Sequence, residues 1–569
     1  MSATLDRDTG LVDAPPSRLR RYRQIASVLV RHGLADVVDA LHLGSYLALG
    51  TRLLPRRARV DPSLSRAARF RLTLEELGPT FIKFGQALSV RADVLPPAFT
   101  AELATLQEHV SPLEPGVAEA VIAREFGQPV EALFTTFDPV PLAAASMAQV
   151  HRATLPTGEI VAVKVRRPGI RRVIAGDVEI LRQLAALVER SFAAAAVVRP
   201  VQLVEEFART IRAELDLARE GRHIEHVARN FAGDPTVRVP WVHWPLTTPR
   251  VLTMEFLDGA RVADLAATGV PVEVRRLVAA RGADAVLAQV LVHGFFHADP
   301  HPGNLLVLDG PDGPVIGFLD FGIVGRLDER HRRQIARVIR AVWRRDAPAL
   351  TTVALAITRP EHDVDVPALE QDLGGLLDAY ADVPLGELSM TEVLTEVIGT
   401  AARHQLRIPS TLMLLIKTVM TIEGVGRQLD PTFRIVRHAA PLADRLWRQE
   451  FSPVALAARA GEATRAAMSA MRAAPANLDA IARKVRDGRL EVRFVHRNLD
   501  HFVREMDRSS NRLSFAIVIG AIVVGSSVVI QAGVGPFVFG YPVLGVGGFL
   551  VAGFLGIGLA IGVLRSGRL

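Results

Sequence analysis

The sequence contains no cysteine among its 569 residues. Disulfide bonds, thiolate zinc sites and cysteine nucleophiles are therefore excluded, while the redox compartment is left open. Aromatic residues make up only 6% of the chain, and no basic stretch alternates with them as a stacking platform for nucleic acid requires. Because the formal net charge is still +7, we expect an anionic membrane surface, and no nucleic acid, as a partner of this basic chain.

Lysine is nearly absent as well. Of 67 basic residues only four are lysine, namely Lys83, Lys164, Lys417 and Lys484. A compact ammonium group kept against such a bias indicates a site that needs a point charge and not a planar guanidinium. Lys83 and Lys164 lie in the motifs described below. Chance placement is plausible for Lys417, on an apolar helical segment, and for Lys484, in a basic run.

Charge is missing from two long runs near the C-terminus, residues 513–533 and 541–564. At ~1.5 Å per residue each run is about 30 Å or more long as a helix, which is enough to cross the core of a bilayer. Small residues recur at every fourth position from Gly548 to Ala560, so two helices, or two copies of the chain, can pack closely there. The alternative is a buried hairpin in a soluble core.

The charges around these runs predict an orientation. The linker, residues 534–540, has no Lys or Arg, whereas Arg512, Arg565 and Arg568 flank the outer ends. Because positive residues stay on the cytoplasmic side, both ends and the rest of the chain are expected on the cytoplasmic face of the inner membrane.

A motif rich in polar side chains lies near the middle of the chain. Asn304 follows Asp299 by five positions, and Asp320 comes after a further apolar stretch. Residues 305–308 and 315–319 are predicted to be the strands of a hairpin, which would bring Asn304 and Asp320 to one end. Protein kinases use this set: an Asp near the acceptor, and an Asn and a second Asp on Mg²⁺. A surface turn rich in Asp, His and Pro is the alternative.

A second motif precedes it. Lys164 ends the predicted strand 159–165, which a turn joins to the strand 150–155, as expected of a lysine that pairs with phosphates. Further elements are predicted at residues 170–190 and 201–231 (helices) and 250–256 (strand). A small β-rich part followed by a larger helical part is the order of the two lobes in protein kinases.

Together these motifs resemble the UbiB/ADCK family of atypical protein-kinase-like proteins, over about residues 72–433. The matching motifs are Lys83-Phe84-Gly85-Gln86, Ala143-Ala144-Ala145-Ser146, Val161-Ala162-Val163-Lys164, Glu214-Leu215-Asp216, His297-Ala298-Asp299 with Asn304, and Asp320-Phe321-Gly322. The resemblance implies an α+β fold of the protein-kinase-like two-lobe type, with an N-terminal helical extension and a C-terminal transmembrane helical hairpin.

The expected domains follow from this resemblance and from the composition. They are a disordered N-terminus (1–17), a helical extension with the Lys83 motif (18–140), an N-lobe (141–260), a C-lobe (261–447), basic juxtamembrane helices (448–512) and a transmembrane hairpin (513–564). Within the extension, residues 18–54 have the pattern of an amphipathic helix pair. We expect this pair to pack on the kinase-like core, and a position on the membrane surface is the alternative.

The resemblance assigns the phosphate-binding and catalytic roles. Lys164 would pair with nucleotide phosphates and with Glu220, and Asn304 and Asp320 would hold Mg²⁺. Asp299 would act as the general base or orient the acceptor.

The same resemblance gives the neighbouring elements a function. Glu214 and Asp216 would form a separate acidic motif, while Lys83 would point to the active site from a helix that blocks peptide substrates. Alanine stands where kinases have a glycine-rich loop, and it resists the φ > 0 geometries that close on phosphates, so an altered ATP or ADP preference is expected. The predicted nucleotide contacts are Ala143, Ala144, Ala145 and the hydroxyl of Ser146, and the backbone of Glu255 to Leu257 for the adenine.

Three functions are consistent with the sequence. The first is an Mg²⁺-dependent ATPase or phosphotransferase that acts on a membrane lipid or isoprenoid-type small molecule in ubiquinone-type biosynthesis. The second is a non-catalytic nucleotide switch or scaffold for a membrane-bound biosynthetic complex. The third is a soluble small-molecule kinase of the aminoglycoside phosphotransferase type, against which the Lys83 motif and the C-terminal hairpin argue.

Overall fold

A computed structural model describes residues 18–40, 64–89, 91, 94–106, 111–191, 199–265, 269–360, 363–381, 383–384, 387–439, 441–442, 461, 468, 499–533, 535–538 and 541–565. The chain divides into two compact units, Met1–Ala458 and Arg459–Leu569. The predicted disordered segment 1–17 and most of the predicted juxtamembrane stretch 448–512 lie outside the described residues. The finer domain boundaries remain predictions.

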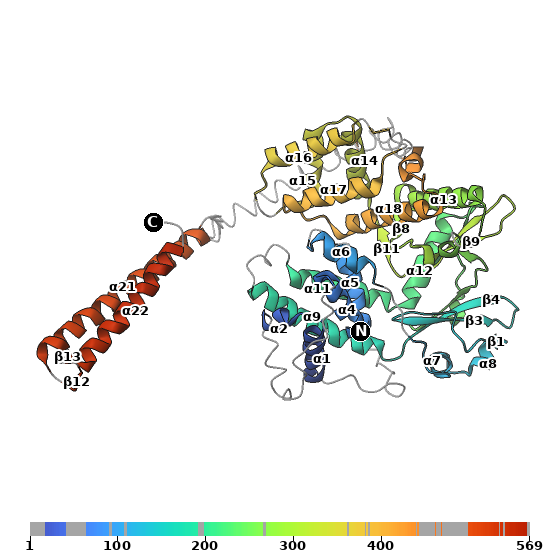
Figure 1. The fold of residues 1–569 in the computed structure, drawn as a ribbon. Helices are drawn as coiled ribbons and strands as arrows, with labels where there is room; N and C mark the ends of the chain where they lie inside the picture. Colours follow the sequence, from blue (N-terminus) through green and yellow to red (C-terminus); the bar gives the residue numbers. More distant parts are fainter. Residues whose placement is uncertain are drawn as a thin grey trace. The chain divides into compact units, whose positions relative to one another are not determined.

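The first unit begins with a helical extension (Figure 1). Its helices are α1 (Arg18–Arg31), α2 (Ala35–Ala40), α4 (Arg66–Leu77), α5 (Pro79–Ser89) and α6 (Pro97–Ala104). The apolar face of α1, including Ile25, is buried together with Phe81 of α5 and Ile174 of α9 (Ile170–Ser191). Arg21 of α1 binds both carboxylate oxygens of Asp177 on α9, at 2.8 and 2.9 Å. The described part of the amphipathic segment therefore packs on the folded core, and residues 41–54 lie outside the described residues.

The N-lobe is built on an antiparallel sheet of five strands. They are β1 (Thr136–Phe137), β2 (Ala143–Ala144), β3 (Ala148–Thr154), β4 (Ile160–Arg166) and β6 (Val251–Glu255), in the order β1-β3-β4-β6 with β2 on β3. Alternate β-branched residues of β4, such as Val161 and Val163, are fully buried with Ile122 of α7 (Val117–Phe126) and with Phe134, which follows α8 (Val130–Leu133). The predicted hairpin is confirmed, with Lys164 opposite Val150.

The single helix predicted over residues 201–231 is wrong. The structure has two helices, α11 (Pro200–Glu214) and α12 (Leu217–Asn230). Asp216 leaves the helical conformation at ψ 94°, and its side chain accepts a hydrogen bond from the backbone N–H of Arg219. Short carboxylate side chains favour such N-caps because they satisfy an N–H group without an intrahelical partner. The break turns Glu214 and Glu220 towards different partners.

The C-lobe begins with the helix α13 (Val272–Leu287), which continues into the π-helical turn η3 (Ala288–His293). Its strands are β5 (Val237–Arg238), β7 (Ala260–Arg261), β8 (Phe295–His297), β9 (Leu305–Leu308), β10 (Val315–Phe318) and β11 (Val324–Arg326), with the 3₁₀ turns η2 (Val262–Asp264) and η4 (Pro302–Asn304). A further 3₁₀ turn, η1 (Trp244–Leu246), packs on β6 of the N-lobe. They form the sheet β5-β10-β9-β7 and the pair β11-β8. The remaining helices are α14 (Glu329–Trp343), α15 (Ala347–Thr358), α16 (Val366–Ala379), α17 (Met390–Arg403) and α18 (Ser410–Leu429).

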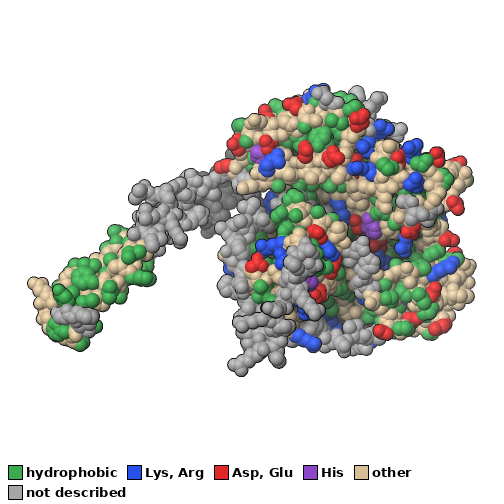
Figure 2. All heavy atoms as spheres, viewed as in Figure 1, with side chains coloured by type: hydrophobic (Ala, Val, Ile, Leu, Met, Phe, Trp, Pro, Cys, Tyr) green, Lys and Arg blue, Asp and Glu red, His purple; other side chains and the backbone are tan. Residues whose placement is uncertain are grey.

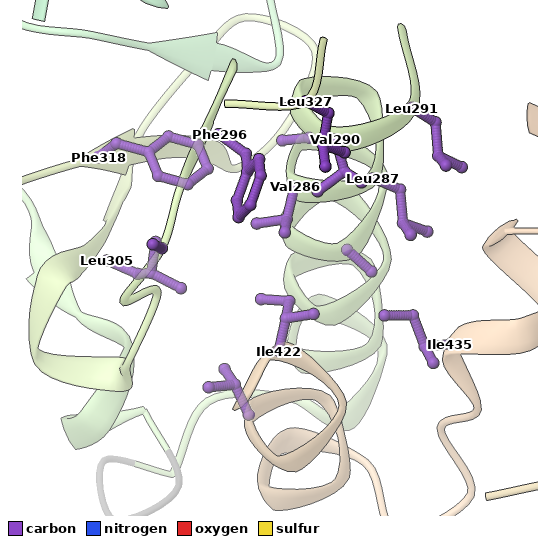
Figure 3. Close-up of a cluster of buried hydrophobic side chains, with 14 of the residues drawn as sticks. Val286, Leu287, Val290, Leu291, Phe296, Leu305, Phe318, Leu327, Ile422 and Ile435 are labelled. Atoms are coloured by element: carbon purple, nitrogen blue, oxygen red, sulfur yellow. The ribbon is translucent and has the colours of Figure 1, made fainter. Parts of the chain in front are cut away.

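One apolar core joins these C-lobe elements (Figure 3). Val286 of α13 and Val290 of η3 lie beside Phe296 of β8 and Phe318 of β10, while Ile422 of α18 closes the core from the other side. The burial of these side chains fixes β8, β9 and β10, whose ends carry the polar motif.

The second unit is a pair of helices, α21 (Leu499–Ala532) and α22 (Val543–Arg565), joined by the short strands β12 (Phe537–Val538) and β13 (Tyr541–Pro542). The two helices pack along each other, and α21 runs through the predicted domain boundary at residue 512. Figure 2 shows hydrophobic side chains over the surface of this pair.

Only one of the two helices satisfies the criteria for a membrane span. Among the described residues, Leu513–Ala532 of α21 is long and apolar enough to span a membrane, and only 6% of its best stretch is buried. The described apolar part of α22, Val543–Leu559, is shorter. The structure thus supports a single apolar helix, and the transmembrane hairpin remains a prediction.

Candidate active site

Lys164 lies between two carboxylates. Its Nζ donates to both oxygens of Glu220 on α12, at 2.8 and 3.0 Å, and to Oδ1 of Asp320, at 3.2 Å. Burial favours the neutral amine, but the two carboxylates outweigh it and raise the pKa of Lys164 above its usual range. Burial raises the pKa of Glu220 to about 7, against the attraction of Lys164, because its side chain is only 4% exposed. The sequence-predicted pair of Lys164 and Glu220 is therefore present.

Asp320 has an unusual backbone and a half-exposed side chain. Its φ of 54° lies in the left-handed region, which costs most residues about 1 kcal/mol or more. Its Oδ1 accepts a hydrogen bond from the N–H of Gly322 at 3.2 Å. Partial desolvation raises the pKa of Asp320, but Lys164 and Lys83 outweigh this effect and hold it well below its ordinary value. Asp320 is therefore an anion at neutral pH, and its side chain is 52% exposed.

The predicted β9–β10 hairpin brings Asn304 and Asp320 to the same end. Leu305 pairs with Phe318, and the N–H of Leu319 donates to the carbonyl oxygen of Asn304 at 2.9 Å. The side-chain amide of Asn304 donates to the carbonyl oxygen of Asp299 at 3.2 Å. The three predicted polar residues therefore lie on two loops that hydrogen bonds hold together.

His297 supports this loop from below. It is fully buried, and its Nε2 lies 2.8 Å from the carbonyl oxygen of Leu319, which can only accept. The ring therefore donates from Nε2, and its Nδ1 accepts the backbone N–H of Asp299 at 3.1 Å. Burial lowers the pKa of His297, which favours this neutral ring. His297 therefore braces the loop through backbone groups, and His301 acts similarly, since its Nδ1 accepts the N–H of Gly303.

Lys417 is the site residue that the sequence did not reveal. It lies on α18, and its Nζ contacts Oδ1 of Asp299 at 2.8 Å. Burial opposes the ionisation of Asp299, but the charge and hydrogen bond of Lys417, with smaller effects from His301 and His297, lower the pKa of this carboxyl. Chance placement was a plausible explanation of Lys417, and the structure shows instead that this lysine pairs with Asp299 of the candidate motif. A contact between residues so distant in sequence has no local signal, and only the scarcity of lysine pointed to it.

Lys83 completes a set of three lysine–carboxylate pairs. Its Nζ lies 2.5 Å from Oε1 of Glu214 at the end of α11, and both side chains are less than 20% exposed. Asp216, the other member of the predicted acidic motif, caps α12 and lies 3.6 Å from Arg222. Because Lys83 also attracts Asp320, the extension helix α5 places a cation next to the candidate metal ligand.

Three protein-family models match the chain. The ABC1 atypical kinase-like domain matches residues 105–354, the UbiB helical domain residues 373–434, and the ABC1/UbiB kinase-like C-terminal domain residues 497–565. A "Probable protein kinase UbiB" of Xanthomonas campestris pv. campestris (strain B100) is 38% identical over 444 residues, which cover 76% of this chain and 79% of that protein. The chain belongs to the UbiB family of atypical kinase-like proteins.

A second UbiB relative is about as similar as the first, and one solved structure is more distant. The "Probable protein kinase UbiB" of Pseudomonas putida (strain W619) is 39% identical over 441 residues, covering 77% of this chain and 82% of that protein. The structure titled "The complex structure of Rv3197-erythromycin from Mycobacterium tuberculosis" is 24% identical, covers 63% of this chain and 90% of that chain, and has a TM-score of 0.44. A likeness at this level supports no conclusion about ligand or mechanism.

The alanine-rich loop of this UbiB-family chain forms β2 and the turn after it. Ala143 and Ala144 pair with Val150 and Gln149 of β3, and the N–H of Ala145 donates to the carbonyl oxygen of Ala148. Ser146 is fully buried in this structure, and its contact with a phosphate remains a prediction.

The predicted adenine-binding backbone is partly engaged. The N–H of Glu255 donates to the carbonyl oxygen of Trp241, and that of Phe256 donates to Ile160. Among the described residues the N–H of Leu257 has no acceptor, and its contact with an adenine remains a prediction.

The donor set at the end of the hairpin fits a magnesium ion. Mg²⁺ prefers oxygen ligands and usually takes one or two from the protein, with water and phosphate oxygens as the others. Asp320 supplies an anionic carboxylate, and Asn304 uses only its NH₂ group internally, so its Oδ1 has no partner among the described residues. In the described part of the chain no three His, Asp or Glu side chains cluster as a self-sufficient metal site.

Proposed function

We propose that this chain is a membrane-anchored atypical kinase or ATPase that uses Mg²⁺ with ATP or ADP and supports isoprenoid-quinone, ubiquinone-type, lipid biosynthesis. One observation carries the proposal. Lys164 bridges Glu220 and Asp320, while Asn304 and Asp299 are joined to each other and to the strand before Asp320. A structural role alone does not require a buried lysine between two carboxylates beside an amide with a free oxygen.

Each residue of the candidate site has its own proposed role in phosphoryl transfer. Magnesium, when bound, neutralises charge on the phosphate oxygens. Asp320 and Asn304 hold the metal, Lys164 binds the phosphates, and Glu220 keeps Lys164 in place. Asp299 orients the acceptor hydroxyl or water, and Lys417 keeps its carboxylate ionised and fixed in position.

The acceptor is a small molecule and not a protein. Lys83 on the extension helix α5 pairs with Glu214 and attracts Asp320, so this helix lies next to the site. In the family that the motifs resemble, this helix lies where a peptide substrate would bind, which supports a small acceptor. An isoprenoid-type lipid at the membrane surface is the acceptor that we propose.

The membrane attachment is the other part of the proposal. The apolar stretch Leu513–Ala532 supports an anchor, and α22, which packs along it, would be its second span. The flanking arginines support a position of the kinase-like unit on the cytoplasmic side of the inner membrane, where it would meet anionic lipid and a biosynthetic complex or a second copy of the chain.

A nucleotide-dependent switch or scaffold is the second candidate. It is favoured by the contact between Lys417 and Asp299, because the carboxylate that should receive a proton already binds an ammonium group. In this alternative, nucleotide binding moves the lobes and no turnover occurs.

The test measures phosphate release by the full chain in detergent, with and without Mg²⁺ and dispersed lipid. Asp320→Asn should abolish Mg²⁺-dependent release, a loss of about 100-fold or more, and leave the fold intact because Asn tolerates a positive φ. Turnover in the wild type that is lost in this variant supports the enzyme. Nucleotide-dependent thermal stabilisation of the wild type without turnover supports the switch, and absence of both contradicts the proposal.

A further inference from the structure

A basic pocket lies on the other side of α12 from the candidate active site's lysine. Its volume is about 660 Å³, and its lining residues come from α12 and β11. The residues that line it are Arg219, Arg222, His223, Glu225, His226, Arg229 and Arg326.

The charge of this pocket is concentrated and poorly compensated. It has four arginines and one carboxylate, and that carboxylate, Glu225, is already bonded to the indole N–H of Trp244. Arg222 has a loose contact with Asp216 at 3.6 Å, whereas Arg219 and Arg229 have no carboxylate partner among the described residues. Burial, together with Arg229 and Arg326, lowers the pKa of His226, so the positive charges of both elements act at one place.

The aromatic ring of Phe295 contacts both α12 and β11 and forms the floor of the pocket. The guanidinium carbon of Arg326 lies 5.0 Å from the ring centre of Phe295, and the ring of His226 lies 4.2 Å from the same ring. Arg326 and Phe295 are paired residues of β11 and β8. The arginine from β11 is therefore held over the pocket floor and faces the arginines of α12.

The pocket is connected to the candidate active site through two residues. His223, which lines the pocket, donates from Nδ1 to the carbonyl oxygen of Phe321 at 3.0 Å, next to Asp320. Glu220, on the same helix, holds Lys164. A ligand that joins α12 to β11 would thus fix the helix of Glu220 against the segment that follows Asp320.

We propose that this pocket binds a phosphate-bearing anion, which bridges the arginines of α12 and Arg326 of β11 and stabilises the arrangement of Glu220 and Asp320. Arginine is suited to this task because its planar group binds phosphate oxygens with two hydrogen bonds. The anion can be a soluble phosphate compound or the headgroup of a lipid. This site goes beyond the proposed nucleotide site and does not depend on turnover.

The test uses inorganic pyrophosphate as the probe and calorimetry of the full chain in detergent. Measurements are made without Mg²⁺ and in a Lys164→Met background, so that the nucleotide site contributes little to binding. The double variant Arg219→Ser/Arg229→Ser should weaken pyrophosphate binding about tenfold or more, because two charge-assisted contacts are lost. Arg326→Ser should weaken it as well, and the combined effect should be less than additive if one anion touches both elements.

The matched control is Arg330→Ser/Arg337→Ser, two exposed arginines of α14, which should leave the affinity unchanged. A second arm measures flotation with phosphatidylglycerol and phosphatidylcholine vesicles. Loss of pyrophosphate binding in the pocket variants identifies a soluble ligand, and loss of phosphatidylglycerol binding alone identifies a lipid headgroup. Equal binding of both probes by wild type and pocket variants would overturn the inference.

The proposed nucleotide site is tested separately. Nucleotide-dependent thermal stabilisation is measured for the double variant Arg219→Ser/Arg229→Ser without the Lys164 change, and it shows whether the nucleotide site still binds.

Discussion

At the scale of single residues, the candidate site is a set of charges that hold each other in the absence of a ligand. Lys164, Lys83 and Lys417 each contact a carboxylate, and each carboxylate lies next to the proposed phosphate or acceptor position. A buried charge without a partner costs several kcal/mol, so these pairs also stabilise the empty site. A bound phosphate would compete for the lysines and a bound metal for the carboxylates. Because each charge would gain a new partner, the free-energy cost of breaking a lysine–carboxylate pair would be moderate.

Lys417→Met should reduce turnover about tenfold or more, with little change in nucleotide KM, because Asp299 loses the group that fixes its carboxylate. The variant also changes the pH dependence. Lys417 lowers the pKa of Asp299, whose other charged or titratable neighbours are His301 and His297 on its own segment. Without Lys417 the carboxyl takes up a proton at higher pH, so the acid limb of kcat/KM should move to higher pH.

Arg427→Met is the matched control, since Arg427 is an exposed cation on the same helix α18. It should change neither turnover nor the acid limb. Lys417→Arg should retain part of the activity, because it keeps the charge. An increase in turnover on loss of Lys417 would instead mean that this residue inhibits Asp299, and would contradict the positioning role.

The sequence predicted only part of the set of contacts at the candidate site. The motifs around Lys164, Asp299 and Asp320 were recognisable because each lies within a short stretch with a fixed spacing. The pair of Lys417 and Asp299 was missed because α18 reaches the loop only after the C-lobe has folded. The burial of Ser146 was also missed, since an alanine-rich segment does not show which of its side chains turns inward.

At the scale of elements, the break between α11 and α12 separates two functions. Glu214 ends one helix and pairs with Lys83, while Glu220 lies in the first turn of the next and pairs with Lys164. On a continuous helix the two carboxylates would be six residues apart and held at one fixed spacing and direction. The break thus allows the extension and the N-lobe to be held by different acidic groups.

Asp216→Ala should destabilise the protein by about 1 kcal/mol and weaken nucleotide binding, because α12 loses its N-cap and Glu220 is held less firmly. Thermal unfolding and nucleotide titration measure the two effects. Asp346→Ala removes a similar cap from α15, far from the site in sequence, and should lower stability without changing nucleotide affinity. Asp216→Ser keeps a capping oxygen and should behave like the wild type, and equal nucleotide affinity in all variants would contradict this role.

Gly325→Ala tests the pairing of β11 with β8. An added Cβ would lie 2.0 Å from Cζ of Phe296, whose ring is fully buried in the C-lobe core (Figure 3). Overpacking of this kind costs about 1–3 kcal/mol, so thermal unfolding should begin several degrees lower. Gly375→Ala on α16 is the control, because its Cβ would meet nothing within 4 Å and should be neutral or stabilising. A wild-type melting curve for Gly325→Ala would show that β11 can move away from β8.

The elements themselves were largely predictable from periodicity and turn residues. The β3–β4 and β9–β10 hairpins lie where the sequence placed them, because their turns and alternating patterns are local. The Asp216 break was not foreseen, since residues 201–231 are helical in pattern on both sides and a single capping aspartate is common on helix surfaces. The pocket of α12 and β11 requires two elements that only tertiary structure brings together.

At the scale of the whole molecule, the two units differ in the surfaces they expose. The kinase-like unit buries its apolar side chains in continuous cores, whereas Leu513–Ala532 leaves most of its apolar surface uncovered. Exposed apolar surface of this extent is unfavourable in water and favourable in a bilayer. The uncharged runs in the sequence predicted this difference. They did not show that α21 begins at Leu499 and continues through residue 512.

The division between the units determines where a soluble kinase-like protein should end. A cut after residue 512 would sever α21, whereas a chain ending at Ala458 contains the whole first unit. We expect this shorter protein to remain soluble without detergent and to show the same Mg²⁺-nucleotide thermal stabilisation as the full chain, because every residue of the candidate site and its apolar cores lie before Ala458. Stimulation of phosphate release by dispersed lipid should be lost, since the apolar helices that would hold the chain at the lipid surface are gone. The full chain without detergent, which should aggregate, is the control. Aggregation or loss of nucleotide stabilisation in the shorter protein would mean that the C-terminal unit contributes to the folded kinase-like unit and is more than an anchor.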